Sequence, residues 1–439
     1  MTEPTTPERT RPRTHADPAP REGSPAREGR PGDAHARTDA PTDAGRPMAP
    51  PSEQAIPLVN RAAESEGVLA RPARRLETER LADLFAAVSM DGDLRLSVER
   101  HPDYFALYDL EHDPEEQHVR AFEKDGEVEG VAAFLARDAL LGGERVRTAY
   151  MSDLRFSDAL RGGKVLGKVF APEMRLAREA TGAELFYTVV FDGNGAAQKA
   201  LVKRDPRWPD KPLYRPLRRF DITSVLLAHP PLPRLRRPYR VTRARAEDMD
   251  EVLAFLQRDQ RGRPFGYVLD EGRFERRLRD WPRFGAESFY LARDGQGRLA
   301  GVTATWDAFD VKRYRVRAYR GAMKRIRRAW DLAAPLLGGT KLPAPGELLR
   351  YAYLTHLCVP SEDPAVLAAL LDAAYADLRG TGLCFLMLYL EREDPLRAAL
   401  RGYLTSAMPA TFYVVCAPDS RFAEVDLGAG RPGFEMALA

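Results

Sequence analysis

Hydrophobic residues recur at two spacings along this chain from about residue 76 onward, and each spacing predicts one kind of element. Apolar residues three or four positions apart predict helices over 77–88, 165–180 and 196–202. Alternating or continuous apolar runs predict strands over 118–124, 128–135, 145–156, 185–191 and 219–227. This alternation of helices and strands predicts a mixed α/β fold.

The same order of elements recurs in the second half of the chain. Strand-like segments lie at 239–242, 288–293, 299–306, 349–359, 383–390 and 411–416. Helix-like segments lie at 246–257, 270–279, 364–378 and 395–404. A proline-rich stretch, 229–238, separates the two series. The pattern predicts two α+β domains of similar architecture, 71–228 and 239–439, each with a mixed, largely antiparallel sheet flanked by helices.

Residues 1–70 differ from the rest of the chain. Before Ile56 the sequence has no Val, Ile, Leu, Phe, Tyr, Trp or Cys, and Pro, Ala, Thr, Arg and Asp dominate. Such a segment cannot bury enough apolar area to offset the entropy that folding costs. We therefore expect a disordered tail over 1–70.

Composition narrows the class of protein. The 67 basic and 64 acidic residues nearly balance, so the charge does not indicate a nucleic-acid surface. No apolar stretch approaches the ~20 residues of a membrane span, and no signal-peptide pattern is visible. The three cysteines, Cys358, Cys384 and Cys416, have no metal-binding spacing. We expect a cytoplasmic protein without a metal, and neither nucleic acid nor a membrane as its partner.

The segment 150–170 carries the candidate chemistry. A strand there leads through a turn that contains Gly162 and Gly163 into a helix. Such a turn presents backbone N–H groups, and the N-terminus of the helix adds about half a positive charge. Arg161 and Lys164 add further positive charge. The segment predicts a site for a phosphate or pyrophosphate.

This strand, turn and helix resemble the cofactor-binding motif of the GNAT superfamily of N-acetyltransferases. The order of elements resembles that fold from about residue 76 to 227, and Asn194 and Ala197 match the N-x-x-A start of the family's next helix. The resemblance implies acetyl-CoA as co-substrate, with the backbone of Leu154 and Phe156 along the pantetheine arm. It implies that Asn194 contacts the arm or an ordered water. It further implies that one continuous segment holds the phosphates: Arg161, Gly162, Gly163, Lys164, Val165, Leu166 and Gly167.

Three positions depart from the family pattern. Lys164 and Leu166 stand where the usual motif has glycine or alanine, and Leu201 stands where the family often has a tyrosine that protonates the departing thiolate. The corresponding turn of the second half, 360–364, has no glycine and carries two acids, which would repel a pyrophosphate. The resemblance thus implies one CoA site, in the first half, while the second half shapes the acceptor pocket.

Transfer of an acyl group from a thioester to an amine needs a base for the amine and an acid for the thiolate. Asp153 is the only carboxylate in the strand 145–156 and is the candidate base. Tyr150 and Tyr187 are the candidate acids. A salt bridge would explain Asp153 equally well, and core packing would explain the two tyrosines. His356, between apolar neighbours, is interpreted as a core histidine.

The prediction is an acetyl-CoA-dependent N-acetyltransferase that acts on a small-molecule or peptide amine. Because no cysteine lies in the first half, we expect direct attack by the amine rather than a covalent enzyme intermediate. The alternative is a non-catalytic acyl-CoA-binding or scaffold protein with the same fold. Transfer of a longer acyl chain also stays open.

The segment 312–328 contains nine basic residues and no acid. Tyr319, Met323, Ile326 and Trp330 recur at helical spacing and predict a basic amphipathic helix. Such a helix could bind nucleic acid, an anionic membrane surface or an acidic acceptor. We favour the alternative that it packs on the second domain by its aromatic edge.

Overall fold

The computed structural model describes residues 59–90, 94–161, 165–228, 238–428 and 430–439. These residues form one compact unit. The expected linker at 229–238 lies, apart from its last residue, outside the described residues, as do residues 1–58 of the expected tail. No helix within the described ranges combines the length and the apolar character that crossing a bilayer requires.

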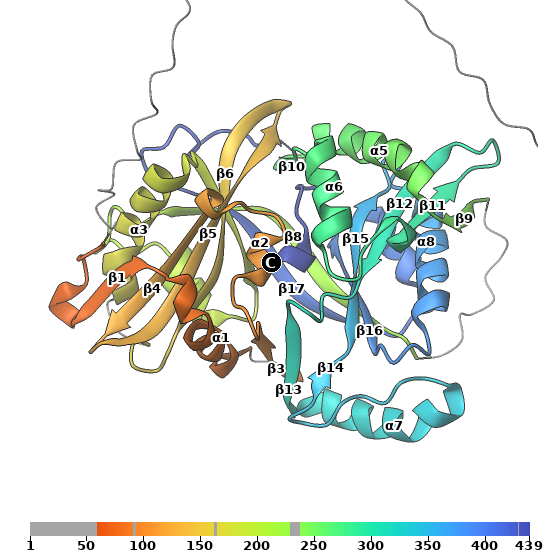
Figure 1. Ribbon diagram of the computed structural model, residues 1–439, viewed down its shortest axis with the longest axis horizontal. Coiled ribbons are helices and arrows are strands. Elements are labelled where there is room, and N and C mark those ends of the chain that lie inside the picture. The colour runs from red at the N-terminus through yellow and green to blue at the C-terminus, as the bar shows by residue number, and fades with distance from the viewer. Residues whose placement is uncertain (1–58, 91–93, 162–164, 229–237, 429) are drawn as a thin grey trace, which may run out of the picture. The chain divides into compact units, whose positions relative to one another are not determined.

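A mixed sheet of thirteen strands runs through the unit (Figure 1). Its strands follow one another in the order β1 (Val68–Pro72), β4 (Gln117–Lys124), β5 (Glu127–Leu141), β6 (Glu144–Phe156), β7 (Leu185–Phe191), β17 (Thr405–Cys416), β8 (Leu213–Leu226), β16 (Phe385–Glu391), β15 (Tyr351–Cys358), β12 (Leu299–Trp306), β11 (Phe289–Arg293) and β9 (Arg240–Arg243). β10 (Gly266–Tyr267) pairs with β5 beside this row. In the described sheet, β6–β7 and β15–β16 are parallel pairs and the other pairs are antiparallel.

Helices cover this sheet at several points. They are α1 (Thr78–Ala87), α2 (Ala106–Asp109), α3 (Val165–Thr181), α4 (Gly195–Ala197), α5 (Met249–Arg261), α6 (Glu271–Asp280), α7 (Gly321–Leu337) and α8 (Pro364–Leu378). α3 connects β6 to its parallel neighbour β7, and α8 connects β15 to its parallel neighbour β16. The same strand–helix–strand unit therefore occurs in both halves of the chain.

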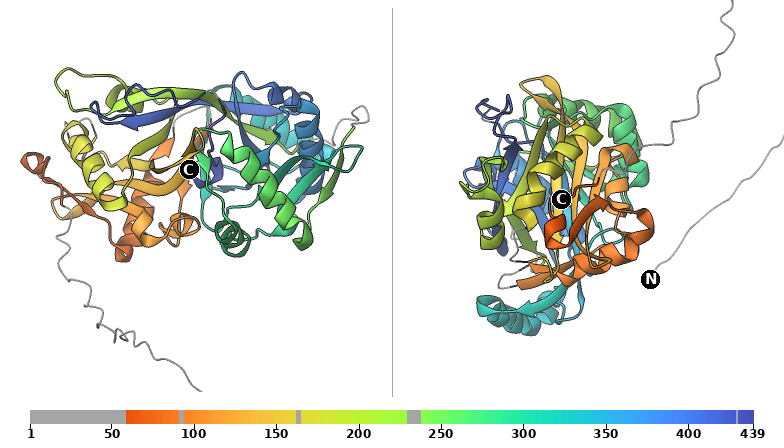
Figure 2. Two further views of the ribbon diagram at one scale, coloured as in Figure 1. Left: turned by 90° about the horizontal axis from the view of Figure 1, so that it is seen from above. Right: turned by 90° about the vertical axis from the view of Figure 1, so that its left-hand side faces the viewer.

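The two halves exchange strands in the middle of the sheet. β8, from the first half, lies between β16 and β17 of the second half, and β17 in turn pairs with β7 of the first half. Seen from above in Figure 2, the blue β17 and the green β8 run side by side across the middle of the unit. The largest hydrophobic cluster spans both halves as well, with Leu185, Phe220, Trp306 and Phe412 among its members. One sheet and one core thus join the halves.

A second, smaller sheet also combines the two halves. Its order is β14 (Leu348–Leu349), β13 (Arg313–Tyr319), β3 (Leu94–Glu99) and β2 (Ser89–Met90). β13 and β3 pair in antiparallel fashion from Arg313↔Glu99 to Tyr319↔Leu94. The sequence pattern did not predict β3, β13 or β14, because β14 has only two residues and because polar or charged residues alternate with the apolar ones in β3 and β13.

The folded part of the chain begins before residue 71, the boundary that composition predicted. Asn60 forms a β-bridge with Ala70, and β1 pairs along its whole length with β4. The Asn60 amide donates to the Glu173 carboxylate at 2.8 Å. Val68 and Ala70 are buried. A segment with so few apolar residues can fold here because it adds a strand to the edge of an existing sheet, which supplies its hydrogen-bond partners and its packing.

The segment 312–328 is not the single helix that its spacing predicted. Its first part is strand β13, in which Val316 is fully buried, and the helix α7 begins only at Gly321. Lys312, just before β13, is buried and donates to an oxygen of Ala439. Tyr314, Val316 and Ala318 alternate as the residues of a strand do, although they lie in the segment for which a helix was predicted. Pairing with β3 stabilises the strand.

Candidate active site

The strands β6 and β7 stay together over only three residue pairs, from Thr148↔Leu185 to Tyr150↔Tyr187. β7 then continues beside β17, whereas β6 runs on to Phe156 with only β5 as its neighbour among the described strands. From Met151 onward, one edge of β6 therefore faces no strand in the described structure. Such an edge offers its backbone groups to an extended ligand, although side chains already donate to the carbonyls of Met151, Leu154 and Phe156.

A β-bulge at Asp153 and Leu154 explains why β6 leaves β7. Both residues lie opposite Ala132 of β5, and Asp153 has a φ of 56°. An extra residue in one strand bends that strand and increases its twist. The bend carries the rest of β6 away from β7.

The backbone of Leu154 and Phe156 faces the open edge. The Ser157 N–H donates to the carbonyl of Glu129 in β5 at 2.9 Å. Because successive residues direct their backbone groups to opposite sides of a strand, those of Phe156 and Leu154 point away from β5. The Arg155 guanidinium already donates to the Leu154 carbonyl at 3.1 Å. These two residues have the orientation that the binding of an extended arm requires.

Asp153 is held in a buried ion pair. Its carboxylate lies 2.7 Å from Nη1 of Arg100, accepts a hydrogen bond from the Tyr108 hydroxyl, and is 6% exposed. Burial by itself would raise the pKa of the Asp153 carboxyl, but the charge of Arg100 and the bond from Tyr108 outweigh it and lower the pKa. Asp153 is therefore an anion, and its Oδ2 atom makes both of these contacts. Its assignment as the base stays a prediction.

The turn that should hold the phosphates is only partly described. Arg161 donates through Nε to the Phe156 carbonyl at 3.1 Å and pairs with Asp158 at 2.8 Å, and its side chain is half exposed. The Trp208 indole covers Gly167, where a Cβ atom would lie 3.0 Å from the ring. Three residues of the predicted motif lie outside the described residues: Gly162, Gly163 and Lys164.

The remaining predicted cofactor residues face the protein interior or serve the local backbone. Val165 is buried, and Leu166 is partly buried against the hydrophobic cluster beneath α3. The Asn194 side-chain oxygen accepts from the Ala197 N–H at 3.0 Å and so caps α4. Leu201 is buried in the same cluster as Leu166. Contact with a cofactor through these side chains stays a prediction.

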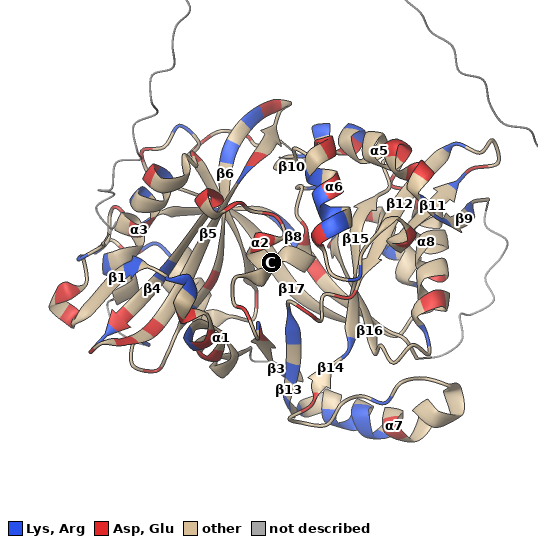
Figure 3. Ribbon diagram, in the orientation of Figure 1, with Lys and Arg blue, Asp and Glu red and all other residues tan. Residues whose placement is uncertain are grey.

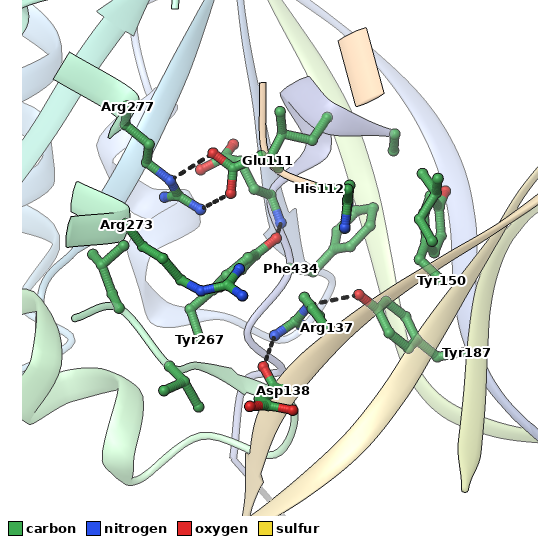
Figure 4. Close-up of a pocket in the computed structure, with 16 residues that line it drawn as sticks. Glu111, His112, Arg137, Asp138, Tyr150, Tyr187, Tyr267, Arg273, Arg277 and Phe434 are labelled. Carbon is green, nitrogen blue, oxygen red and sulfur yellow. Dashed lines mark hydrogen bonds and ion pairs between the residues drawn. The ribbon is translucent and has the colours of Figure 1, made fainter. Parts of the chain in front are cut away.

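A cavity opens where β6 and β7 part (Figure 4). The empty space between its lining residues is about 570 Å³, part of which is open solvent. Both halves of the chain line it, with Glu111, His112, Leu135, Arg137, Asp138, Tyr150, Tyr187, Tyr267, Val268, Leu269, Arg273, Arg277, Phe434, Glu435, Leu438 and Ala439. The structure thus brings together two of the predicted catalytic residues, Tyr150 and Tyr187, whereas Asp153 is not part of this lining.

The two tyrosines stand next to each other at the end of the parallel pair. Their ring centroids are 5.2 Å apart. The Tyr187 hydroxyl accepts from Nε of Arg137 at 2.8 Å, which leaves its own proton free to be donated. Burial raises the pKa of Tyr150 well above its usual value, so this hydroxyl stays protonated. Both groups can serve as proton donors toward the cavity.

His112 contributes a basic lone pair to the same cavity. Its Nδ1 lies 2.9 Å from the Ala136 carbonyl oxygen, which can only accept, so Nδ1 carries the proton and Nε2 holds the lone pair. Burial lowers the pKa of His112, and the neighbouring Glu111 offsets only part of that effect. The ring is therefore neutral at pH 7 and oriented by the backbone.

At the corresponding strand edge of the second half, the chain itself supplies a hydrogen-bond acceptor. β15 and β16 pair from Tyr351↔Phe385 to Tyr353↔Met387 and then part, and β15 has its own bulge at His356, whose φ is 51°. The His356 N–H donates to the Glu435 carboxylate at 3.1 Å. A second cavity borders this edge, and His356 and Glu435 both line it.

Sequence reasoning missed His112 and Glu435. His112 follows α2 in an acidic loop, and Glu435 lies near the last residue of the sequence, and neither fits a spacing motif. A histidine flanked by acids is the only local sign, and it is a weak one. Their positions at the cavity depend on how the two halves pack.

No protein-family model matches this chain, and no curated protein matches it in sequence. Solved structures do match it. Saccharomyces cerevisiae N-myristoyltransferase with bound myristoyl-CoA superposes with a TM-score of 0.53 at 10% identity, over 80% of this chain and 79% of that chain. The GCN5-related glucosamine N-acetyltransferase region of a fungal multi-domain β-N-acetylglucosaminidase gives a TM-score of 0.52 at 13% identity, over 79% of this chain and 38% of that chain. At such identities the likeness shows the fold.

Proposed function

We propose that the chain transfers an acyl group from a CoA thioester to an amine. It has the fold of the GNAT N-acetyltransferases, which the sequence motif predicted, and of N-myristoyltransferase. In this proposal the thioester arm lies along the open edge of β6 and the amine enters the cavity beside it. Acetyl-CoA is the proposed donor, and a small-molecule or peptide amine is the proposed acceptor.

One observation carries the proposal. The open edge of β6 begins at Met151, and the residue before it, Tyr150, lines the cavity. An arm that adds to this edge as an extra strand would therefore end at the cavity wall, where two hydroxyls and an imidazole are already placed. The neighbour structure that holds myristoyl-CoA shows that the same fold binds an acyl-CoA.

His112 supplies the base in this proposal. An alkyl amine is mostly protonated at pH 7, so it must lose a proton before it can attack. The neutral imidazole accepts that proton at Nε2, while the Nδ1–H bond to Ala136 keeps the ring in place. Asp153, the base that the sequence predicted, is kept as the anion that fixes Arg100 beside the bulge.

The transfer balances with these groups. The amine nitrogen forms a bond to the thioester carbonyl carbon and gives a proton to Nε2 of His112. The C–S bond then breaks, and the thiolate takes a proton from the Tyr187 hydroxyl, whose phenolate the Arg137 guanidinium stabilises. Water finally returns the proton from the imidazolium to the phenolate, so both residues are restored. No covalent enzyme intermediate is needed.

Binding is tested by the melting temperature in the presence of acetyl-CoA. A ligand at 100 times its dissociation constant stabilises the folded state by about 2.7 kcal/mol, which should raise the melting temperature of the parent by several degrees. Arg161→Glu should reduce the shift, because it places a negative charge beside the open edge of β6. Arg175→Glu, an exposed position on α3, is the matched control and should keep it. Absence of any shift in the parent would contradict the proposal.

Catalysis is tested by release of free CoA thiol with a panel of amines. His112→Asn keeps an amide N–H for the Ala136 carbonyl and removes the basic lone pair, so we expect turnover to fall by about 10²–10⁴-fold while the acetyl-CoA shift persists. His101→Asn, a half-exposed histidine away from the cavity lining, should leave turnover unchanged. Binding without thiol release from any amine would instead support the non-catalytic alternative.

A further inference from the structure

The helix α7 presents an outward face that nothing in the described structure covers. It lies beside β13 and β14 at the lower margin of Figure 1, away from the main sheet. Leu332 and Leu336 on this face are 79% and 88% exposed. Side chains of this size seldom stay so exposed in pairs on a helix without a binding role.

The inward face fixes which way α7 is turned. Trp330 and Ala334 are buried, and the Trp330 indole N–H donates to the Thr340 carbonyl at 2.9 Å. A Cβ atom at Gly339 would lie 2.5 Å from the Trp330 ring, so the following loop packs closely on the indole. Because the face of α7 that carries Trp330 and Ala334 is packed against the protein, Leu332 and Leu336 point outward.

The outward face is basic in its first half and apolar in its second half. Lys324, Arg325 and Arg328 are exposed in the first turns, and no ion pair joins them to an acid of the described chain. The one acid of α7, Asp331, pairs with Arg327 at 3.5 Å. Figure 3 shows the blue residues gathered on the part of α7 nearest β13 and the tan remainder beyond them.

From this arrangement we infer that α7 docks the protein on the surface of an anionic lipid bilayer. The helix lies parallel to the surface, with Leu332 and Leu336 among the acyl chains and Lys324, Arg325 and Arg328 against the lipid phosphates. This inference does not rest on the proposed function.

Charge complementarity and apolar exposure together select this occupant. A nucleic acid or an acidic protein segment would pair with the three cations but would leave both leucines in water. A second copy of the chain could cover the leucines but would leave the three cations without an anionic partner. The chain's own residues 1–55 have no aliphatic or aromatic side chain larger than those of Ala, Pro and Met with which to cover the leucines, and the larger apolar residues outside the described ranges are Ile56, Leu58, Leu232 and Leu235. A bilayer with anionic lipids satisfies both parts of the face.

The test is co-sedimentation of the full chain with vesicles of phosphatidylcholine, with and without phosphatidylglycerol. The parent should bind the anionic vesicles and bind neutral ones weakly. The double variant Leu332→Ser, Leu336→Ser should bind at least about a hundred-fold more weakly, since each buried leucine is worth about a factor of ten or more. The triple variant Lys324→Gln, Arg325→Gln, Arg328→Gln should lose a comparable factor.

Matched controls show whether position on α7 matters. Leu404→Ser removes a leucine that is 52% exposed elsewhere, and a triple variant removes three exposed cations outside α7: Arg258→Gln, Arg261→Gln and Arg401→Gln. Both should bind like the parent. Unchanged melting temperatures would show that the variants fold.

Three results would overturn the inference. The first is no binding of the parent to anionic vesicles. The second is binding that depends on the three cations but not on the two leucines, which would show that the leucines do not enter the bilayer. The third is vesicle binding that survives the leucine variant while that variant converts a dimer to a monomer in solution.

Discussion

Asp153 and His356 adopt the same unusual backbone conformation at matching points of the two halves. Their φ angles are 56° and 51°, and each lies at a bulge where one residue of the neighbouring strand faces two. A left-handed residue other than glycine persists only where its surroundings compensate for the strain. At Asp153 the surroundings are Arg100 and Tyr108, and at His356 they are Glu435 and Arg277. The two positions therefore share a backbone conformation and differ in the side chains that they carry and contact.

The ion pair of Asp153 leads to a prediction about stability. Arg100 is 1% exposed and lies within 5.0 Å of the Phe85 ring centre and 4.8 Å of that of Tyr108. Asp153→Asn leaves this buried cation without its anion, so we expect a loss of about 3–5 kcal/mol in the free energy of unfolding. Asp158→Asn, which removes the exposed partner of Arg161, should cost less than about 1 kcal/mol. Denaturant unfolding measures both.

The pH dependence of that loss follows from the lowered pKa of Asp153. A carboxyl whose pKa is lower in the folded state stabilises the protein above its usual pKa, which is 3.8, and the stabilisation is lost as the pH falls through the folded-state value. The difference between parent and Asp153→Asn should therefore be full at neutral pH and shrink only below about pH 4. A difference that stays constant into strong acid would contradict the ion-pair explanation.

At the scale of elements, the segment that ends the sequence completes the second half. Glu435 receives the His356 N–H, and Tyr389 donates its hydroxyl to the Phe434 carbonyl at 2.5 Å. The segment thus lies where β15 and β16 part, beside a cavity that Phe434 and Glu435 help to line. Of the two acids that the sequence placed in the turn before α8, Asp363 caps that helix through the Ala365 N–H.

Glu435 gives this segment a pH-dependent stability. Burial raises the pKa of its carboxyl to about 7, against a usual value of 4.5. The folded state then holds the proton more tightly than the unfolded state, so this group lowers stability as the pH rises from about 4.5 to about 7. Glu435→Gln cannot ionise, and its melting temperature relative to the parent should rise over that interval. Glu424→Gln, at an exposed site, should show no such trend, and a flat difference for Glu435→Gln would contradict the burial of a titrating carboxyl.

At the scale of the whole molecule, the exchange of β8 and β17 makes each half depend on the other. β7 needs β17 as its neighbour, and β8 has strands of the second half on both sides. The cavity is shared in the same way, since Tyr150 and Tyr187 come from the first half and Tyr267 and Arg277 from the second. Neither half contains a complete site by itself.

We therefore expect cooperative unfolding of the full chain in one calorimetric transition. A fragment of residues 59–228, expressed alone, should be unfolded or aggregated, because the exposed edge of β7 and both edges of β8 would lack partners. Co-expression with residues 238–439 should restore a soluble complex. Two separate transitions, or a stable and monomeric fragment, would contradict this dependence.

Much of the local structure was open to prediction because it depends on local spacing. The predicted bounds of β7, β12 and α8 agree with the structure, since each is an apolar run between polar or glycine-containing turns. Other strands, such as β5 and β8, extend well beyond the predicted ends. Their outer parts are stabilised by neighbours distant in the sequence, which spacing cannot reveal.

By itself, the sequence determined the elements of the GNAT fold, the strand that bears the bulge and the two tyrosines at the cavity, because periodicity and turn chemistry act between near neighbours. Only the tertiary structure decided that Asp153 is paired with Arg100, that His112 faces the cavity, that Glu435 accepts from the His356 N–H and that the halves exchange strands. Each of these depends on residues brought together from distant parts of the chain. Burial and charge pairing arise from that packing, and they set what each side chain can do.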